Sequence, residues 1–207
     1  AAAAVVHDVR NSLGVIQSTA QFVLSKMNPA EREKEAWQLV ERNVESIRKL
    51  LKGYLGLARQ SENPKEETSL NEIVERVSHF IDVKAGKNDV RVVKALAPSL
   101  PKVLIEASAV EAAILNLSIN AIEAMEGGGT LKFTTAASAG SVSVEIEDTG
   151  PGFPPEIKNK LFTPFSTTKQ NGTGMGLYSA KAIAPQNEGK ISCESQPGKT
   201  RMVLSFP

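Results

Sequence analysis

Apolar positions at helical spacing dominate the first sixty residues of the chain. The pattern predicts a helix from about Ala3 to Met27, with an apolar face formed by Val9, Leu13, Ile16, Ala20 and Met27. Pro29 ends this helix and is well tolerated at the start of the next, predicted from about Ala30 to Gln60. That second helix carries apolar residues at alternating steps of four and three, namely Val40, Val44, Ile47, Leu51 and Tyr54.

The two helices are expected to form an antiparallel hairpin. The second helix is charged on its other face, at Glu31, Arg32, Glu41, Arg42, Glu45, Arg48 and Lys49. Two helices alone have too little mass to bury both of their apolar faces. Such a hairpin normally pairs with a copy of itself into a four-helix bundle, so we predict a homodimer.

The pattern changes after the polar, proline-containing segment Ser61–Glu67, which we interpret as a linker. Helices are predicted over about Leu70–Ala85, over about Ser108–Met125 with Ser108 as N-cap, and from near Met175. Strands are predicted at Val90–Ala95, Leu131–Ala136, Ser141–Asp148, Lys190–Ser195 and Arg201–Phe206. Interleaved strands and helices favour a two-layer sandwich. The predicted fold class is therefore α+β, with a helical hairpin at residues 1–62 and an α/β sandwich at residues 63–207.

Composition narrows the class of protein. The chain has 24 basic and 23 acidic residues and a net charge of +1, without a basic block, so we expect no nucleic-acid partner. No apolar run approaches the ~20 residues of a membrane helix, and no signal peptide is visible. The single cysteine, Cys193, excludes an internal disulfide and fits the cytoplasm. Because the sequence is already helix-like at Ala1, we expect a missing upstream part, which could anchor a longer protein in a membrane.

One histidine of the first helix is placed for chemistry rather than packing. His7 projects from roughly the opposite face to the apolar residues, Asp8 follows it, and Asn11 lies one turn further on. A lone surface histidine without a role is the ordinary alternative. A phosphoryl acceptor is the functional one, and it requires a nucleotide site elsewhere in the chain.

Two asparagines interrupt the otherwise apolar helix predicted at Ser108–Met125. Asn116 and Asn120 lie one turn apart on one face of that helix. Burying a carboxamide without a partner costs about 1–3 kcal/mol, so both need partners. They either cap a neighbouring loop or supply oxygen ligands to a Mg²⁺ ion that also holds phosphates.

An acidic residue ends the strand predicted at Ser141–Asp148. Val142, Val144 and Ile146 alternate toward the interior, and Asp148 is in phase with them. Gly150 and Gly152 permit a tight backbone next to that carboxylate. Asp148 either caps a turn or accepts a hydrogen bond from an exocyclic amine.

A third candidate feature is a glycine loop that leads into a helix. Gly172, Gly174 and Gly176 occupy every second position, and Lys169 precedes them. Free backbone N–H groups at a helix N-terminus suit a phosphate chain. The pattern is neither a P-loop nor a dinucleotide fingerprint, and a flexible loop is the alternative.

The order of these features resembles the catalytic core of a bacterial two-component sensor histidine kinase, with the GHKL (Bergerat) ATPase fold. The phosphoacceptor box, the asparagine box and the two glycine boxes are similar to His7–Leu13, Asn116–Met125, Asp148–Phe153 and Gly172–Leu177. The segment Leu161–Lys169 resembles the nitrogen-regulator branch, which has a short ATP lid. The resemblance covers nearly the whole chain.

The resemblance implies a role for each matching residue. His7 would accept the γ-phosphate of ATP, Asp8 would polarise the ring, and Asn11 would position water for the reverse dephosphorylation. Asn120 would bind Mg²⁺ and Asn116 the phosphates, while Asp148 would bind the adenine amine with support from Thr200. The floor of the site would be shaped by Gly150 and Gly152, and the triphosphate would be covered by Lys169, Gly172, Gly174, Gly176 and Leu177.

The implied activity is that of a protein-histidine phosphotransferase of the EC 2.7.13.3 type, with ATP and Mg²⁺ as cofactors. Its partners would be a second copy of the chain and the receiver domain of a response regulator, whose aspartate takes the phosphoryl group. Two alternatives are a scaffold that binds nucleotide without turnover and an ATPase of the same fold. The scaffold predicts decay in the asparagine or glycine boxes, and the ATPase leaves His7 unexplained.

Two departures from the family pattern stand out. The usual His-Gly-Gly turn is replaced by the stretch Ala184–Gly189, in which Pro185 is expected to end the preceding helix early. Glu123 stands where many relatives carry a basic residue, and we assign it no role.

Overall fold

The computed structural model describes Gly14 and residues 64–207, apart from residues 139, 159, 165 and 168–173. The described residues divide into two units. One holds residues 64–166 and 176–207, and the other holds Gly14, Thr167, Gly174 and Met175. All the strands and helices below belong to the first unit. The predicted helical hairpin and its dimer seam lie outside the described residues.

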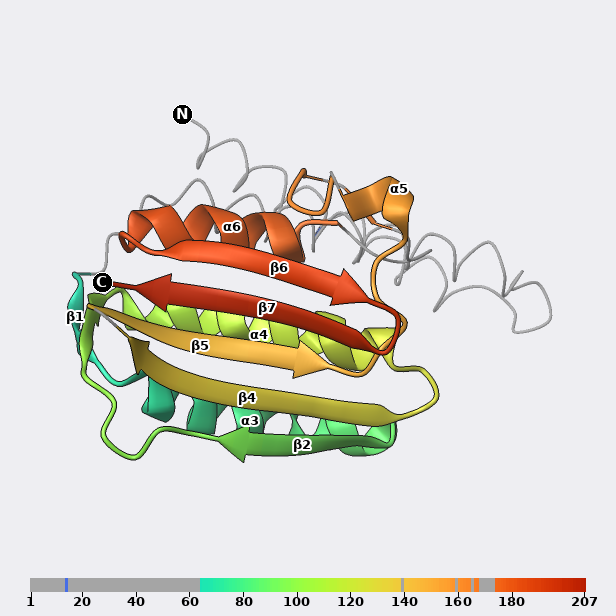
Figure 1. Cartoon of the computed structure of the whole chain (residues 1–207), viewed down its shortest axis with the longest axis horizontal. Coiled ribbons are helices and arrows are strands. Elements are labelled where there is room, and N and C mark those ends of the chain that lie inside the picture. Colours follow the sequence, from blue (N-terminus) through green and yellow to red (C-terminus); the bar gives the residue numbers. More distant parts are fainter. Residues whose placement is uncertain (1–13, 15–63, 139, 159, 165, 168–173) are drawn as a thin grey trace. The chain divides into compact units, whose positions relative to one another are not determined.

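A five-stranded sheet forms the framework of the first unit (Figure 1). Its strand order is β2-β4-β5-β7-β6, with β2 parallel to β4 and the other pairs antiparallel. The strands span β2 Val90–Ala95, β4 Gly129–Ser138, β5 Ser141–Asp148, β6 Lys190–Gln196 and β7 Lys199–Phe206. All five predicted strands are therefore confirmed, with ends that differ by at most two residues.

Three helices cover one face of this sheet, which gives the predicted two layers (Figure 1). They are α3 Leu70–Lys87, α4 Ala107–Ala124 and α6 Gly176–Gln186. Strand residues alternate between the two faces, so every second side chain packs against the helices. The largest fully buried side chains of this interface are Phe133, Phe206, Leu70, Ile73, Ile81, Ile105, Ile114, Ile122, Leu131 and Leu204.

Helix α3 begins at a side-chain cap. The Ser69 hydroxyl accepts a hydrogen bond from the Glu72 N–H at 3.4 Å, which satisfies one of the free donors of the first turn. Lys84 and Lys87 lie in the last turn, where cations interact favourably with the helix dipole. Its buried residues recur at steps of three and four, and the helix predicted over about Leu70–Ala85 is confirmed.

Helix α4 starts differently from the prediction. Its N-cap is Glu106, which makes no side-chain capping bond, so the expected cap at Ser108 is wrong. The Glu106 N–H instead donates to Oδ1 of the buried Asn187, at 2.7 Å. A residue distant in sequence thus holds the start of α4, and a local sequence rule could not find it.

Helix α6 also departs from the prediction, because Pro185 lies inside it and the helix continues to Gln186. Proline in the last turn removes only one backbone hydrogen bond, and the end of the helix is otherwise well satisfied. Glu188 adopts a left-handed φ of 58°, and Gly189 N–H donates to Ala184 C=O at 2.8 Å. This C-cap is a Schellman motif, so the helix does not need to stop before the proline.

Short elements complete the unit. Strand β1 (Glu66–Thr68) pairs antiparallel with β3 (Val103–Ile105), and α5 spans Pro155–Lys158. The segment interpreted as a linker therefore ends in a strand, which is a correction. In the described residues, no helix is long and apolar enough to cross a membrane.

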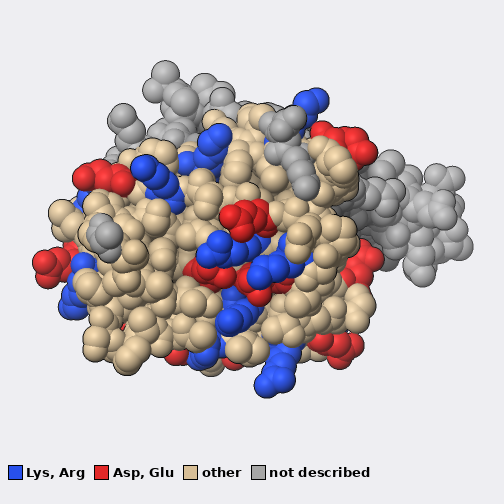
Figure 2. Space-filling view, in the orientation of Figure 1, with Lys and Arg blue, Asp and Glu red and all other residues tan. Residues whose placement is uncertain are grey.

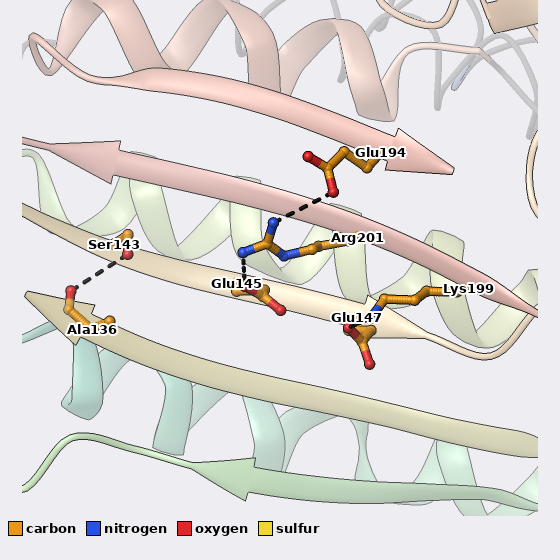
Figure 3. A network of polar contacts seen from close by, with 7 residues as sticks. All are labelled: Ala136, Ser143, Glu145, Glu147, Glu194, Lys199 and Arg201. Carbon is orange, nitrogen blue, oxygen red and sulfur yellow. Dashed lines mark hydrogen bonds and ion pairs between the residues drawn. The ribbon is translucent and has the colours of Figure 1, made fainter. Parts of the chain in front are cut away.

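The other face of the sheet is partly exposed and carries interleaved charges (Figure 2). Arg201 bridges Glu145 at 2.6 Å and Glu194 at 3.5 Å, and Lys199 pairs with Glu147 at 2.9 Å (Figure 3). These residues alternate along β5, β6 and β7 with residues of the helix-covered face. The alternation thus separates a charged outer face from the face that holds the candidate site.

Candidate functional site

The candidate site is centred on the last residue of β5. Strand alternation turns the Asp148 side chain toward the helices, and only 6% of the residue is exposed. Its Oδ1 accepts a hydrogen bond from the Gly150 N–H at 2.9 Å. The prediction that Asp148 faces the interior is confirmed.

Burial changes the acidity of this carboxyl group. Desolvation raises the pKa of Asp148 above its ordinary 3.8, and the negative charge of Glu147 adds to the rise. The hydrogen bond from Gly150 lowers the pKa but does not cancel the effect of burial. A carboxylate that is short of favourable contacts is a strong acceptor for a donor brought by a ligand.

A hydroxyl group lies on the neighbouring strand, directly beside this carboxylate and on the same face of the sheet. Thr200 of β7 is the register partner of Asp148, and 5% of it is exposed. Thr200 is in turn the register partner of Ser195 on β6, and their hydroxyl oxygens lie 3.1 Å apart. Three polar side chains therefore form one row on the helix-covered side of a mostly apolar sheet.

The loop after β5 is shaped by two glycines. Gly152 has a left-handed φ of 77°, and a Cβ atom there would lie 2.7 Å from the Gln196 carbonyl oxygen. A Cβ atom on Gly150 would lie 2.8 Å from Oδ1 of Asp148. Gly150 also accepts a hydrogen bond from Gly198 N–H at 2.9 Å. Only glycine lets this loop lie against Asp148 and the β6–β7 hairpin.

The two asparagines of α4 are half-buried, and Asn120 lies beside the start of α6. Within the described part of the chain, neither Asn116 nor Asn120 has a hydrogen-bond partner for its carboxamide. A Cβ atom on Gly176, the first residue of α6, would lie 2.9 Å from Nδ2 of Asn120. Asn120 therefore lies beside a helix N-terminus, where free N–H groups attract anions.

This donor set fits Mg²⁺ only together with phosphate. Mg²⁺ prefers oxygen ligands and usually takes few from the protein, with substrate phosphates and water completing its shell. The Asn120 carboxamide has no hydrogen-bond partner among the described residues and lies next to a helix N-terminus, which suits that arrangement. In the described residues no group of three acidic, histidine or cysteine side chains offers a metal site of its own.

Several predicted site residues lie outside the described residues, namely His7, Asp8, Asn11, Lys169 and Gly172. Gly174 has a left-handed φ of 64° and belongs to the other unit. Leu177 is partly buried and packs on the core through the first turn of α6. Glu123, which stands where many relatives carry a basic residue, forms an ion pair with Lys84 of α3. This ion pair links α4 to α3.

Sequence reasoning missed Ser195 and Asn187. Ser195 looked like the end of an ordinary strand, and only the register with Thr200 shows its place beside the site. Asn187 lies in the stretch that departs from the family pattern, so attention to that departure could have found it. Its Nδ2 donates to the Ile183 C=O at 3.0 Å while its Oδ1 holds Glu106.

Taken together, the site offers a buried acceptor, a neighbouring hydroxyl group, two amides and a helix N-terminus. A ligand with an amine at one end and phosphates at the other matches this set. A family model described as histidine kinase-, DNA gyrase B- and HSP90-like ATPase matches residues 106–207. The fold and the site thus define an ATPase-type domain of this class.

The similar proteins place the chain more closely. It is 31% identical over 213 residues to the sensory histidine kinase/phosphatase NtrB of Vibrio alginolyticus, covering 97% of this chain and 60% of that protein. It is 30% identical to the catalytic domain of histidine kinase ThkA, with a TM-score of 0.64, over 70% of this chain and 96% of that domain. The chain belongs to the histidine kinases. It spans about 60% of the length of the curated relatives that it matches first.

Two further structures share the fold. Full-length ShkA in complex with AMPPNP aligns with a TM-score of 0.79 at 20% identity, over 100% of this chain and 45% of that one. ThkA in complex with the response regulator TrrA aligns with a TM-score of 0.72 at 24% identity, over 99% of this chain and 60% of that one. At these identities the likeness concerns the fold.

Proposed function

We propose that this chain is the core of an ATP-dependent protein-histidine kinase that phosphorylates its own His7. The phosphoryl group then passes to an aspartate of a response regulator, and the same protein catalyses the reverse dephosphorylation. The observation that carries the proposal is the buried Asp148–Thr200 pair beside the loop of Gly150 and Gly152, in a chain of the histidine kinase family. AMPPNP in the ShkA structure and the regulator in the ThkA structure support the ligand and the partner.

Asp148 would recognise the base of ATP. A carboxylate accepts from the exocyclic amine of adenine, whereas the 6-oxo group of guanine would face it with a second acceptor. Burial makes this contact stronger, because the carboxylate is largely shielded from solvent and has a single donor, Gly150 N–H, within the described part of the chain. Gly150 and Gly152 form the floor on which the base would lie.

The phosphates would lie between α4 and the start of α6. Asn116 would hold phosphate oxygens, and Asn120 would hold Mg²⁺, which supplies positive charge for the developing transition state. Around them, Lys169, Gly172, Gly174, Gly176 and Leu177 would cover the triphosphate and exclude water. Phosphoryl transfer needs mainly positioning and charge neutralisation, and this set offers both.

The acceptor would be His7 on the hairpin. Asp8 would polarise the imidazole and take its proton, and Asn11 would orient the water that hydrolyses the regulator's phosphoaspartate. We further propose that residues 1–62 form the dimerising hairpin and that residues 63–207 form the ATP-binding domain. The hairpin would also dock the receiver domain of the regulator, in the cytoplasm.

Incubation with γ-labelled ATP and Mg²⁺ tests the proposal. We expect acid-labile, alkali-stable label on the wild type and none on His7→Gln. Label that persists in His7→Gln would refute the assignment of the acceptor. ATP binding without any label would favour a nucleotide-binding scaffold, and release of free phosphate without label would favour an ATPase.

A further inference from the structure

A serine, Ser195, lies next to the proposed base site. Ser195, Thr200 and Asp148 are register partners across β6, β7 and β5, so their side chains lie in one row on the same face of the sheet. The Phe153 N–H donates to the Ser195 hydroxyl at 2.9 Å. Ser195 therefore joins the loop after β5 to Thr200, and it contacts both sides of the site.

The hydrogen bonds around Ser195 favour one orientation of its hydroxyl group and of the Thr200 hydroxyl group. With one acceptor position of Ser195 taken by Phe153 N–H, its own proton needs an acceptor, and a hydroxyl group has one proton to donate. Among the described residues, Oγ1 of Thr200, 3.1 Å away, is the acceptor within reach. If Ser195 donates to Thr200, the Thr200 proton must point away from Ser195, and no described protein group accepts it.

We propose that Ser195 is a positioning residue that makes the Thr200 hydroxyl a hydrogen-bond donor toward the ring nitrogen N1 of a bound 6-aminopurine. The proposal rests on the function proposed above. Asp148 would accept from the exocyclic amine while Thr200 donates to N1, which matches adenine at both positions. A 6-oxopurine has an acceptor and an N1–H donor there, so both contacts would be lost.

A purely structural role for Ser195 makes a different prediction. Its bond to Phe153 N–H holds the loop, and a Cβ atom on Gly152 would lie 3.0 Å from the Ser195 hydroxyl, so the packing is close. Loss of that support would weaken the binding of every nucleotide to the same extent. Loss of a directed donor would weaken the binding only of nucleotides that carry an acceptor at position 1.

The test compares ADP with 1-deaza-ADP, in which N1 is replaced by C–H, by calorimetric titration of the intact chain with Mg²⁺. Because one neutral hydrogen bond is at stake, Ser195→Ala should weaken ADP binding about three- to tenfold. The same variant should leave 1-deaza-ADP binding within about twofold of wild type. It should also narrow the preference for ADP over inosine diphosphate.

Two variants complete the cycle. Thr200→Val should weaken ADP binding at least as much as Ser195→Ala, and the double variant should be no weaker than Thr200→Val alone. Ser195→Thr keeps a hydroxyl group and should restore ADP binding. Thermal unfolding without nucleotide shows whether each variant is folded.

Equal weakening of ADP and 1-deaza-ADP, or additive losses in the double variant, would overturn the role of Ser195. Unchanged ADP binding in Ser195→Ala would overturn it as well. Failure of the wild type to bind ADP at all would instead refute the proposed function.

Discussion

At the scale of a single residue, the buried Asp148 carboxylate is expected to lower the stability of the fold while it contributes to nucleotide binding. Its pKa is raised by burial, so the ionised carboxylate is less favourable in the folded than in the unfolded chain. Asp148→Asn removes the charge but keeps an oxygen for Gly150 N–H. We expect this variant to be more stable than wild type at neutral pH and to lose ten- to a hundredfold in ADP affinity, because a charged hydrogen bond is lost.

The sign of the pH dependence follows from the raised pKa. Below 3.8 the carboxyl group is protonated in both states, so the variant has no electrostatic advantage. As pH rises from 3.8 toward the raised pKa, wild type loses stability relative to Asp148→Asn, and the difference levels off above the raised pKa. Urea unfolding of both proteins from pH 3 to 7.5 measures it.

Glu147→Gln is the matched control for Asp148→Asn. Glu147 is the adjacent residue on the outer face, where it pairs with Lys199 at 2.9 Å (Figure 3). This partly exposed pair contributes about 0–1 kcal/mol, and Glu147 has the smallest of the three influences on the pKa of Asp148, so stability should change little and ADP affinity should stay within about twofold. A difference between wild type and Asp148→Asn that does not vary with pH would contradict the desolvation of Asp148.

At the scale of elements, the fit between α4 and α6 positions the phosphate end of the site. A Cβ atom on Gly176 would lie 2.9 Å from Nδ2 of Asn120, so Gly176→Ala must displace that carboxamide. We expect the rate of His7 labelling to fall about ten- to a hundredfold, because small misplacements of catalytic groups are costly. Stability should change little, because Gly176 is the first residue of α6 and the group that must move is the end of a flexible side chain.

Gly86→Ala provides the comparison for Gly176→Ala. Gly86 lies in the last turn of α3, and nothing lies within 4 Å of the Cβ atom that would be added. This variant should gain about 0.5–1 kcal/mol in urea unfolding and label His7 at the wild-type rate. If Gly176→Ala labels His7 at the same rate as wild type, that result would argue against the proposed place of Asn120 in the site.

The long, periodic elements were predictable, and the short ones were not. Helix α3 and strand β5 follow regular apolar spacing, which local sequence reveals. Strands β1 and β3 have three residues each and exist because they pair with one another across about forty residues of sequence. The same limit explains the wrong cap at Ser108, because the group that holds the start of α4 is Asn187, far along the chain.

At the scale of the whole molecule, the candidate site shows the same limit. Asp148 could be placed by strand phase alone, whereas the role of Thr200 came from the family resemblance. Ser195 and Asn187 act through strand register and helix packing, which no local pattern reports. Sequence thus identifies groups that meet a ligand more readily than the groups that orient them.

The proposed division of the chain predicts what each part does alone. The apolar core from Leu70 to Phe206 lies within residues 63–207, so that fragment should fold cooperatively and bind ADP within about twofold of the full chain. It should incorporate no acid-labile label from γ-labelled ATP, since it lacks His7. Adding residues 1–62 as a separate fragment should restore the label, on the added fragment.

A shorter fragment tests the boundary itself. Residues 69–207 keep the Ser69 cap of α3 but lack β1, whose three residues pair with β3, and Lys65, which contacts Glu188 at 2.8 Å. Removing β1 leaves the backbone donors and acceptors of β3 without their partners and uncovers Val103 and Ile105, which are buried in the intact chain. We expect this fragment to melt several degrees below residues 63–207 in a calorimetric scan. Equal melting temperatures would place the start of the folded unit after β1, and a fragment 63–207 that fails to fold would refute the proposed boundary.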